Sequence, residues 1–294
     1  MKNLWRKRRL LLSRVPELLE KKRYQAFFCT RRKEFYQAFS LVYRRYLACQ
    51  LIRPNEKEIF YTLYQALPES RVCVSCGPDP SQITSTATIV IDSPLGLPSD
   101  STYHQELNRL RDKGRKLAEI TCLAAEKDFC YRNGLLFVLR LLYRYAVRKK
   151  VTDFVISIHP KHRDFYEKIF LFEPIGPIKN YKNLYNAPAI LEHLDLTTVK
   201  EKFYEAYGDF PEGKIFADFF LKISFLSDIE ELSKVKNMKS RDFWYFFMKF
   251  ETLFPSFPPD FQAFFAINFD LVLQEKIDEE IGEETEEEKL LEIA

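Results

Sequence analysis

The stretch RDKGRKLAEITCLA, residues 111–124, decides the fold of this chain. It begins as the charged end of a helix, turns at Gly114 and continues as a strand with one carboxylate, Glu119, among apolar neighbours. A glutamate is unfavourable in a strand and costly to bury, so it needs a partner or a chemical task. An amphipathic helix over residues 135–148 follows, and then a second strand over residues 151–159. This order predicts a crossover between parallel neighbouring strands, which we interpret as the walls of an active-site cleft.

The residues on either side of this stretch predict a mixed α/β (α+β) fold. Apolar residues that recur every three or four positions indicate helices, and alternation indicates strands. The helices are expected at residues 15–28, 33–49, 56–67, 101–113 and 160–170. The remaining strands are expected at residues 71–76, 84–92, 172–178 and 187–196. Ser99 or Asp100 is expected to cap the helix at 101–113.

We expect three regions along the chain, with a boundary at Thr197–Thr198 where short, Phe-rich helices begin. Residues 1–196 form the α+β domain, in which basic helices (1–67) precede the sheet (71–196). Residues 197–274 form a Phe-rich helical extension, and residues 275–294 form an acidic tail that is solvated or disordered. The extension is expected to pack on the α+β domain, because so many exposed phenylalanines would form a large apolar patch.

Composition excludes several classes of function. With 8 glycines in 294 residues, and no G-x-G-x-x-G, Walker A or H-E-x-x-H pattern, glycine-rich phosphate loops and zinc-protease sites are not expected. Six scattered cysteines and the lack of a secretory apolar segment indicate a reduced, cytoplasmic protein. Cys73 and Cys76 form a CxxC pair without a second pair at zinc spacing, so we interpret them as buried strand cysteines and expect no metal.

Charge is distributed unevenly, with basic residues at the start of the chain and acidic residues at its end. The basic start could attract nucleic acid, an anionic membrane or an acidic carrier protein, or could form ordinary charged helix faces. No nucleic-acid motif or aromatic platform accompanies it, so nucleic acid is not expected as a partner. Peripheral membrane contact, through the basic start or a lipid product, stays open.

Four blocks together carry a family resemblance. They are FSLVYRRYLACQLI (39–52), IDSPLGLPSDSTYHQELNRLRDKGRKLAEITCLA (91–124), VTDFVISIHPKHRDFYEKIFLFEPIG (151–176) and YNAPAILEHLDL (185–196). Over roughly residues 32–196 the chain resembles the FeeM-type N-acyl amino acid synthases, GNAT-like enzymes related to the acyl-homoserine-lactone synthases. The resemblance implies a GNAT fold, a long-chain acyl donor on acyl carrier protein, and an amino acid as acceptor. No permanently bound cofactor is implied, since the donor is an acyl-phosphopantetheine.

Two departures from related families refine this expectation. GNAT enzymes that use coenzyme A carry an R/Q-x-x-G-x-G/A loop after the carboxylate strand, where backbone N–H groups hold the pyrophosphate. Here residues 131–137 read YRNGLLF with Gly134 alone, which favours acyl carrier protein over coenzyme A. The homoserine-lactone synthases place E-x-S/T-R on the strand. This chain has Cys122 in place of the arginine, which counts against lactone formation.

Amide formation from a thioester requires a base, an oxyanion site and a carboxylate clamp for the acceptor. Glu119 is the candidate base and ammonium anchor, with a structural ion pair to Arg111 or Arg115 as the alternative. Backbone N–H groups near Thr121, Cys122 and Leu123 are the candidate oxyanion donors. The candidate clamps for the acceptor carboxylate, in order, are Arg115, Arg111 and Arg45. Tyr103 could close this pocket or belong to the core.

The donor requires a thioester slot, an acyl tunnel and a docking surface. His159 could line the slot or protonate the leaving group, or could be satisfied by backbone at the strand end. The candidate tunnel residues are Phe137, Leu141 and Phe154, which could also be plain core. The candidate carrier-protein surface is one basic patch of Lys149, Lys150, Lys161 and Arg163.

Two other functions stay open on sequence alone. One is a GNAT enzyme that uses coenzyme A esters, and the other is a non-catalytic GNAT-like adaptor that acts through its helical extension. The sequence does not identify the amino acid or the acyl chain length.

Overall fold

The computed structural model describes residues 25–77, 79–126, 134–182, 184–222, 226–250 and 254–269. The chain divides into two compact units, Met1–Asn237 and Met238–Ala294. The larger unit contains the sheet and the candidate site.

An eight-stranded sheet forms the centre of the first unit. Its strand order is β1-β2-β3-β4-β5-β8-β6, and β7 pairs with β8 away from this path. The strands are β1 (Gln25–Phe28), β2 (Arg71–Cys76), β3 (Ile83–Ile91), β4 (Leu117–Ala125), β5 (Asp153–Ile158), β6 (Glu173–Pro174), β7 (Lys179–Tyr181) and β8 (Ala187–Asp195). β4 and β5 pair in parallel, whereas the other neighbours pair antiparallel. This confirms the crossover predicted around Glu119.

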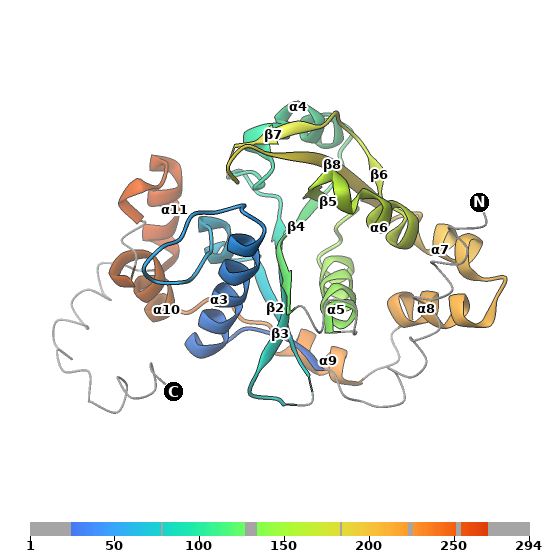
Figure 1. Ribbon diagram of the computed structural model, residues 1–294, viewed down its shortest axis with the longest axis horizontal. Helices are drawn as coiled ribbons and strands as arrows, with labels where there is room; N and C mark the ends of the chain where they lie inside the picture. The colour runs from blue at the N-terminus through green and yellow to red at the C-terminus, as the bar shows by residue number, and fades with distance from the viewer. Residues whose placement is uncertain are drawn as a thin grey trace. The chain divides into compact units, whose positions relative to one another are not determined.

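Helices cover both faces of this sheet, as Figure 1 shows for α3 and α5 on opposite sides of β2, β3 and β4. The helices of the first unit are α3 (Arg32–Ala48), α4 (Asp100–Arg111), α5 (Gly134–Arg148), α6 (Arg163–Phe165), α7 (Val199–Tyr207), α8 (Pro211–Leu221) and α9 (Leu226–Ser233). Short turns complete it: η1 (Leu63–Ala66), η3 (Pro160–His162) and η4 (Tyr166–Phe170). The result is the predicted α+β class.

The core on the α5 face is unusually aromatic and includes the helices that follow the sheet. Phe203 of α7 stacks on Phe216 of α8, with their ring centroids 6.1 Å apart. Phe216 in turn meets Phe170 at 6.2 Å, and all three rings share one core with Phe154 of β5. Aromatic pairs of this kind add to the free energy gained from area burial. α7 and α8 are therefore an integral part of the sheet unit.

A buried ion cluster joins α5 to α9. The side chains of Arg140 and Arg144 contact the carboxylate of Asp228 at 2.6 and 3.0 Å, and all three residues are buried. The guanidinium of Arg140 also lies 4.5 Å from the ring centroid of Phe219 on α8. Because breaking a buried pair leaves an uncompensated charge, this cluster specifies how α8 and α9 pack on α5.

The second unit has a small aromatic core of its own. Its described elements are α10 (Ser240–Trp244), the π-helical segment η5 (Tyr245–Phe250), η6 (Phe254–Ser256) and α11 (Pro259–Phe269). Phe243 is fully buried at the centre and stacks on Phe269 at 4.2 Å and on Phe247 at 5.0 Å. Phe265 completes the cluster, 5.1 Å from Phe243.

The structure corrects two of the predicted helices. Residues 25–28 of the predicted helix at 15–28 form β1, because the edge of β2 offers them a full set of backbone partners. Residues 56–67 begin with a turn, continue without regular secondary structure and end in the short turn η1. Tyr61 there stacks on Phe39 of α3 at 4.8 Å, so tertiary contacts override the helical periodicity.

The expected regional boundary is also in a different place. The compact units divide after Asn237 and not at Thr197–Thr198, because α7, α8 and α9 share the core of the sheet. The basic residues before position 25 and the acidic tail at 275–294 lie outside the described residues. Within the described ranges, none of the helices combines the length and the apolar character needed to cross a bilayer.

Candidate active site

A gap opens between β4 and β5 at the carboxylate. The parallel ladder consists of three pairs and ends at Glu119 with Val155. Beyond this pair β4 continues to Ala125, while β5 continues to Ile158 and pairs along its whole length with β8 on its other side. The facing edges of β4 and β5 are therefore unpaired with each other past Glu119. We call this unpaired stretch between the two strands the strand gap.

A bulge in β4 accompanies the strand gap. The register with β3 slips between Thr86 and Thr88, and Cys122 has a positive φ of 48°. A bulge of this kind bends a strand and increases its twist, and such features concentrate beside functional sites. Positive φ is uncommon for a residue other than glycine and is a form of backbone strain. The strain lies among the residues predicted to bind the oxyanion.

Glu119 is buried on the α3 face of the sheet with a relative exposure of 1%. Its Oε2 accepts a hydrogen bond from the backbone N–H of Ser99 at 2.9 Å, and its Oε1 accepts one from the Ser99 hydroxyl at 2.7 Å. The Ser99 hydroxyl also lies 2.6 Å from the hydroxyl of Ser157 on β5. Burial raises the pKa of Glu119 to about 8, although the two bonds from Ser99 lower it. The group is therefore poised to exchange a proton near neutral pH.

The loop before α4 holds Ser99 in this position. Ser99 is the N-cap residue of α4, yet its hydroxyl bonds the carboxylate of Glu119 and not the helix. The following Asp100 accepts a hydrogen bond from the N–H of Leu97 at 2.7 Å. Arg111, at the end of α4, binds both Asp92 and Asp100 with bidentate contacts of 2.7 to 2.9 Å. Arg111 thus ties both ends of the loop to α4.

Tyrosines surround the carboxylate. Burial and the charge of Glu119 together raise the pKa of Tyr64 to about 12. Burial and then Glu119 also raise the pKa of Tyr181 on β7. Burial raises the pKa of Tyr46 on α3, as do the charges of Cys122 and Tyr181. These phenols stay protonated at neutral pH, and the hydroxyl of Tyr64 donates to the carbonyl oxygen of Leu97 at 3.3 Å.

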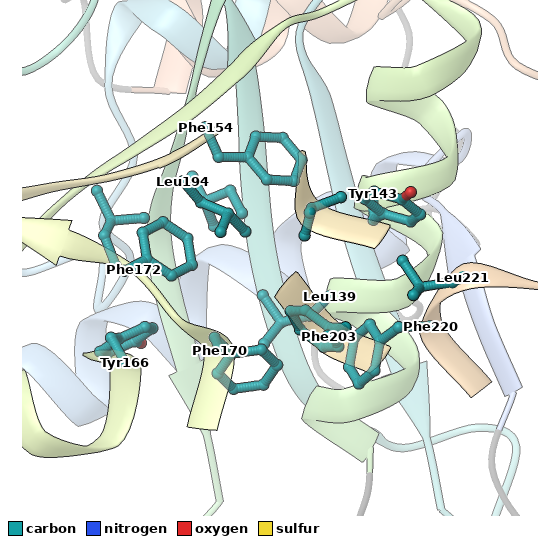
Figure 2. A pocket seen from close by; sticks show the side chains of 13 residues that line it. Leu139, Tyr143, Phe154, Tyr166, Phe170, Phe172, Leu194, Phe203, Phe220 and Leu221 are labelled. Carbon is teal, nitrogen blue, oxygen red and sulfur yellow. The ribbon is translucent and has the colours of Figure 1, made fainter. Parts of the chain in front are cut away.

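An apolar pocket lies on the other face of the sheet, beneath α5, α7 and α8. Its cavity volume is about 40 Å³, and it is partly open to solvent. It is lined by Ile120, Leu139, Tyr143, Phe154, Ile156, Tyr166, Phe170, Phe172, Leu194, Val199, Phe203, Phe220 and Leu221. Figure 2 shows these side chains converging on the pocket, and the labelled ones are hydrocarbon apart from the two tyrosine hydroxyls.

One of the three predicted tunnel residues lines this pocket. Phe154 does, whereas Phe137 and Leu141 are not among the lining residues. On α5 the lining positions are Leu139 and Tyr143, which are four residues apart and so share a helix face. Phe137 instead packs edge-on against Phe219, with centroids 5.1 Å apart, and Leu141 is fully buried in the core.

Two of the three predicted carboxylate clamps are already paired with carboxylates. Arg111 is held by Asp92 and Asp100, as described above. The guanidinium of Arg115 contacts Asp153 at 2.5 Å and Asp195 at 2.6 Å, below the start of β4. Asp153 is also bound by His193, and these bonds hold its pKa at about 2 against the effect of burial. Neither arginine pairs with Glu119, contrary to the alternative considered for that residue.

The third arginine, Arg45, is half-buried on α3 and makes no ion pair with any described residue. Its neighbour Arg44 contacts Glu126, just past the end of β4, at 2.6 Å. Arg45 is therefore the predicted clamp that keeps its guanidinium available.

Tyr103 is a core residue. It is fully buried, and its hydroxyl donates to the carbonyl oxygens of Ala189 at 2.6 Å and Pro177 at 3.2 Å. Lys179 lies 4.8 Å from its ring centroid. Tyr103 therefore fastens α4 to β7 and β8, and the interpretation that it closes a pocket is wrong.

The four predicted docking cations do not form one patch. Lys149 and Lys150 precede β5, and Lys161 and Arg163 follow it, so the length of β5 separates the two pairs. Six residues of strand span about 20 Å. The strand gap opens toward the end of β5 that carries Lys161 and Arg163. Lys149, at the other end, contacts Glu69 at 2.6 Å.

His159 ends β5 beside the strand gap and is half-buried. Its Nδ1 accepts a hydrogen bond from the backbone N–H of Lys161 at 3.1 Å. Burial and the charge of Lys161 lower its pKa. A neutral imidazole with Nδ1 as acceptor carries its proton on Nε2, which stays available as a donor.

Sequence reasoning missed several residues of this site. The sequence predicts Ser99 only as a helix cap and does not distinguish Ser157, Tyr64 or Tyr181 from other residues. A serine between apolar residues of a buried strand, as in VISI, is a weak signal for Ser157. The tyrosines carry no signal, because core aromatic residues have the same pattern.

The structure places no metal-binding cluster among the described residues. Cys73 and Cys76 are buried on β2 as free thiols. The thiol of Cys76 lies 3.2 Å from the carbonyl oxygen of Pro80, and that of Cys73 lies 3.9 Å from the carbonyl oxygen of Val138.

Comparison with known proteins identifies the fold and the family. The sequence profile of the N-acyl amino acid synthase FeeM matches residues 37–195. The structure of FeeM, an N-acyl amino acid synthase from uncultured soil microbes, is 26% identical with a TM-score of 0.55. That match covers 63% of this chain and 97% of FeeM.

Other solved structures show weaker likeness. The AHL synthase LasI is 14% identical with a TM-score of 0.43, and the match covers 59% of this chain and 89% of LasI. A putative N-acetyltransferase from Lactobacillus plantarum is 12% identical with a TM-score of 0.42, covering 59% of this chain and 99% of that one. Comparison with curated protein sequences finds no match.

The family match spans more than half of the chain and includes the strand gap, Glu119 and the loop that carries Ser99. The chain belongs to the FeeM family of N-acyl amino acid synthases, which are N-acyltransferases with a GNAT-like α+β fold.

Proposed function

We propose that this enzyme transfers a long acyl chain from an acyl carrier protein thioester to the amine of an amino acid. In this proposal the thioester lies in the strand gap, the amine meets Glu119, and the acyl chain enters the apolar pocket. One observation carries the proposal. Glu119 is buried on one face of β4, and the next residue, Ile120, lines the pocket on the other face. A basic site and an apolar site thus adjoin the same gap.

The strand gap offers the passage between these two sites. β4 and β5 form a continuous wall up to the pair of Glu119 with Val155 and are unpaired with each other beyond it. Ile120 and Ile156, the next residues on the two strands, both line the pocket. A pantetheine arm in the gap would place its thioester carbonyl within reach of both faces.

Glu119 supplies the base in this proposal. An amino acid amine is mostly protonated at neutral pH and must lose a proton before it can attack. A carboxylate whose pKa is about 8 holds a proton more strongly than an ordinary glutamate, so it is a better base. The hydroxyls of Ser99 and Ser157 connect it to β5 at 2.7 and 2.6 Å. They form a path by which a proton can reach Glu119 from the gap.

The proposed transfer consists of attack by the amine, collapse of the oxyanion and proton transfer. The amine nitrogen attacks the thioester carbonyl carbon, a C–N bond forms, and the carbonyl oxygen becomes an oxyanion. Backbone N–H groups of the bulged segment near Thr121, Cys122 and Leu123 are the proposed donors to it. The oxyanion collapses, the C–S bond breaks, and the amine proton passes to Glu119. Glu119 then returns this proton to the thiolate, to which the Nε2–H of neutral His159 can donate a hydrogen bond, leaving an amide and a free thiol.

The acceptor carboxylate requires a cation on the α3 face of the sheet, near Glu119. Of the three arginines considered, Arg45 is our remaining candidate, since Arg111 and Arg115 already bind aspartates. An arginine suits this role because its guanidinium can bind a carboxylate through two parallel hydrogen bonds.

For the donor, Lys161 and Arg163 support an acidic carrier protein. Both are exposed and follow the end of β5 toward which the gap opens. An acidic carrier surface docked there would direct its pantetheine arm into the gap. Residues 127–133, at the position where other GNAT enzymes bind the coenzyme A pyrophosphate, lie outside the described residues.

The test compares donors directly. The full-length enzyme is incubated with an amino acid mixture and either a long-chain acyl carrier protein or the matching coenzyme A ester, and products are identified by mass spectrometry. We expect N-acyl amino acids, formed faster from the carrier protein, with the advantage shrinking as salt rises. Equal rates without salt dependence would overturn the choice of donor. A lack of any N-acyl amino acid from either donor would overturn the proposed reaction.

A further inference from the structure

A second buried carboxyl, Glu192, lies on β8. It is fully buried, and neither carboxyl oxygen has a hydrogen-bond partner among the described protein groups. Burial of a carboxyl without a partner is costly, so an unpaired one in a core indicates a task that the rest of the fold does not reveal. Glu192 differs in this respect from Glu119, which Ser99 binds on both oxygens.

Glu192 borders the apolar pocket. Residues two apart on a strand share a face, so Glu192 lies on the same face as Leu194, which lines the pocket. Its cross-strand partner on β5 is Ile156, another lining residue. Burial raises the pKa of Tyr166, a third lining residue, and the charge of Glu192 raises it further, which indicates that the two side chains are close.

The position of Glu192 along the pocket is near the strand gap. Ile156 directly follows Val155, the last residue of β5 that pairs with β4. Paired residues on neighbouring strands lie about 5 Å apart, so Glu192 is one strand spacing from the gap wall. An acyl chain that enters from a thioester in the gap would pass this carboxyl with its first few carbons.

We propose that Glu192 binds a hydroxyl group on the acyl chain close to the thioester, so that the enzyme prefers 3-hydroxyacyl donors over unsubstituted ones. The inference rests on the proposed function, because it takes the apolar pocket as the acyl site. The lining residues are hydrocarbon apart from two tyrosine hydroxyls, and Glu192 lies beside two of them, Ile156 and Leu194, on the same face of the sheet. It would act as a specificity-determining residue and take no part in the transfer itself.

The chemistry favours a hydroxyl over other substituents. A hydroxyl both donates and accepts, so it pairs with a carboxyl in either protonation state, and burial raises the pKa of Glu192 to about 7. An ammonium group would have to enter among phenylalanines, at a large desolvation cost. An unsubstituted chain would cover the carboxyl and leave it unpaired, which costs more than a hydrogen bond gains.

Glu192 makes no ion pair with any of the described residues. Arg163, whose charge lowers the pKa of Glu192, binds Glu167 on the next helical turn at 2.6 Å. This pair provides a matched control. Glu167→Gln removes a nearby negative charge that also acts on Glu192, yet it leaves the carboxyl at the pocket in place.

The experiment measures kcat/KM of the full-length enzyme for 3-hydroxyacyl and unsubstituted acyl carrier protein of equal chain length. We expect wild type and Glu167→Gln to prefer the hydroxylated donor by about tenfold, the value of one hydrogen bond to a carboxyl. Glu192→Gln should keep part of this preference, because an amide also donates and accepts. Glu192→Leu should abolish the preference and keep or raise activity on the unsubstituted donor.

Two outcomes overturn the inference while the proposed function stands. One is equal or better use of the unsubstituted donor by wild type, as expected if Glu192 holds only water. The other is a preference for the hydroxylated donor that Glu192→Leu leaves unchanged. Thermal unfolding checks that both variants are folded. If wild type transfers neither donor to an amino acid, the proposed function itself is overturned. If it transfers both, Glu119→Gln should slow both equally, which separates the role of the base from that of Glu192.

Discussion

Ser99 binds both oxygens of the Glu119 carboxyl, one through its backbone N–H at 2.9 Å and the other through its hydroxyl at 2.7 Å. The two residues are 20 positions apart in the chain, and the bond joins the N-terminus of α4 to the middle of β4. The cap residue of a helix is thus used to orient a candidate base. Burial raises the pKa of that base and the serine lowers it, so the value of about 8 is a balance of the two effects.

Ser99→Ala tests this balance. The variant loses one of the two bonds that lower the pKa of Glu119, so the pKa should rise above about 8. Since the base acts when ionised, the limb of the pH–rate profile of kcat/KM should move to higher pH and activity at pH 7 should fall. Ser101→Ala, on the first turn of the same helix, is the matched control and should leave the profile in place. A profile that does not move would show that Ser99 does not set the pKa.

The free energy of unfolding should fall as the pH rises, because burial raises the pKa of Glu119 in the folded state. The pKa of Glu119 is about 8 in the folded protein, whereas an ordinary glutamate has a pKa of 4.5. Between these two pH values the folded state holds a proton that the unfolded chain has lost. Its contribution to stability is full below about pH 4.5 and is lost as the pH rises through about 8. Glu192, with a pKa of about 7, acts in the same direction.

Glu119→Gln should therefore gain stability relative to wild type as the pH rises from 5 to 9, by up to a few kcal/mol. Urea unfolding at pH 5, 7 and 9 measures the difference. Glu173→Gln, an exposed residue on β6, is the control and should show no such trend. A constant difference between Glu119→Gln and wild type at all three pH values would contradict the raised pKa.

Arg111→Met separates a structural role from acceptor binding. Its guanidinium holds Asp92 and Asp100, so we expect a loss of about 2 kcal/mol in unfolding free energy, because two carboxylates lose their partner. The loop that carries Ser99 should loosen, which lowers kcat. A variant with unchanged stability and kcat but a raised KM for the amino acid would restore the earlier interpretation of Arg111 as the carboxylate clamp.

Charge reversal at the two ends of β5 locates the docking surface. Lys161→Glu with Arg163→Glu should raise the KM for acyl carrier protein several-fold, because these residues lie beside the mouth of the strand gap. The matched control is Lys149→Glu with Lys150→Glu, which makes the same charge change at the far end of β5 and should have little effect. A simple acyl-pantetheine should respond to neither pair. Equal effects of the two pairs would argue against a specific docking surface.

Much of the sheet could be predicted from sequence because its signals are local. The strand, helix and strand around Glu119 each carry a clear periodicity, and the turn at Gly114 has the positive φ of 72° that favours glycine. The prediction of a helix at 15–28 is wrong at its end, because residues 25–28 pair with a strand more than 40 positions away. Pairing over such a distance leaves no local pattern.

The candidate site was less predictable, since its geometry depends on partners from several elements. Glu119 could be singled out because a carboxylate in an apolar strand is unusual. Arg115 forms ion pairs with Asp153 on β5 and Asp195 on β8. Both strands lie far from it in sequence, so no local pattern indicates this pairing. In the same way, the separation of Lys150 from Lys161 follows only when the direction of β5 is known. The pocket residues on α5 are Leu139 and Tyr143, which lie on a different face of the helix from the predicted Phe137 and Leu141.

The most direct test of the central claim is a single-turnover measurement of amide formation by wild type and Glu119→Gln at pH 8. Acyl carrier protein loaded with a long chain is mixed with excess enzyme and amino acid, and the N-acyl product is quantified by mass spectrometry over time. If Glu119 is the base in the strand gap, the variant should form product about 10²-fold more slowly while binding the donor as tightly as wild type. Product formation by Glu119→Gln at the wild-type rate would contradict this account.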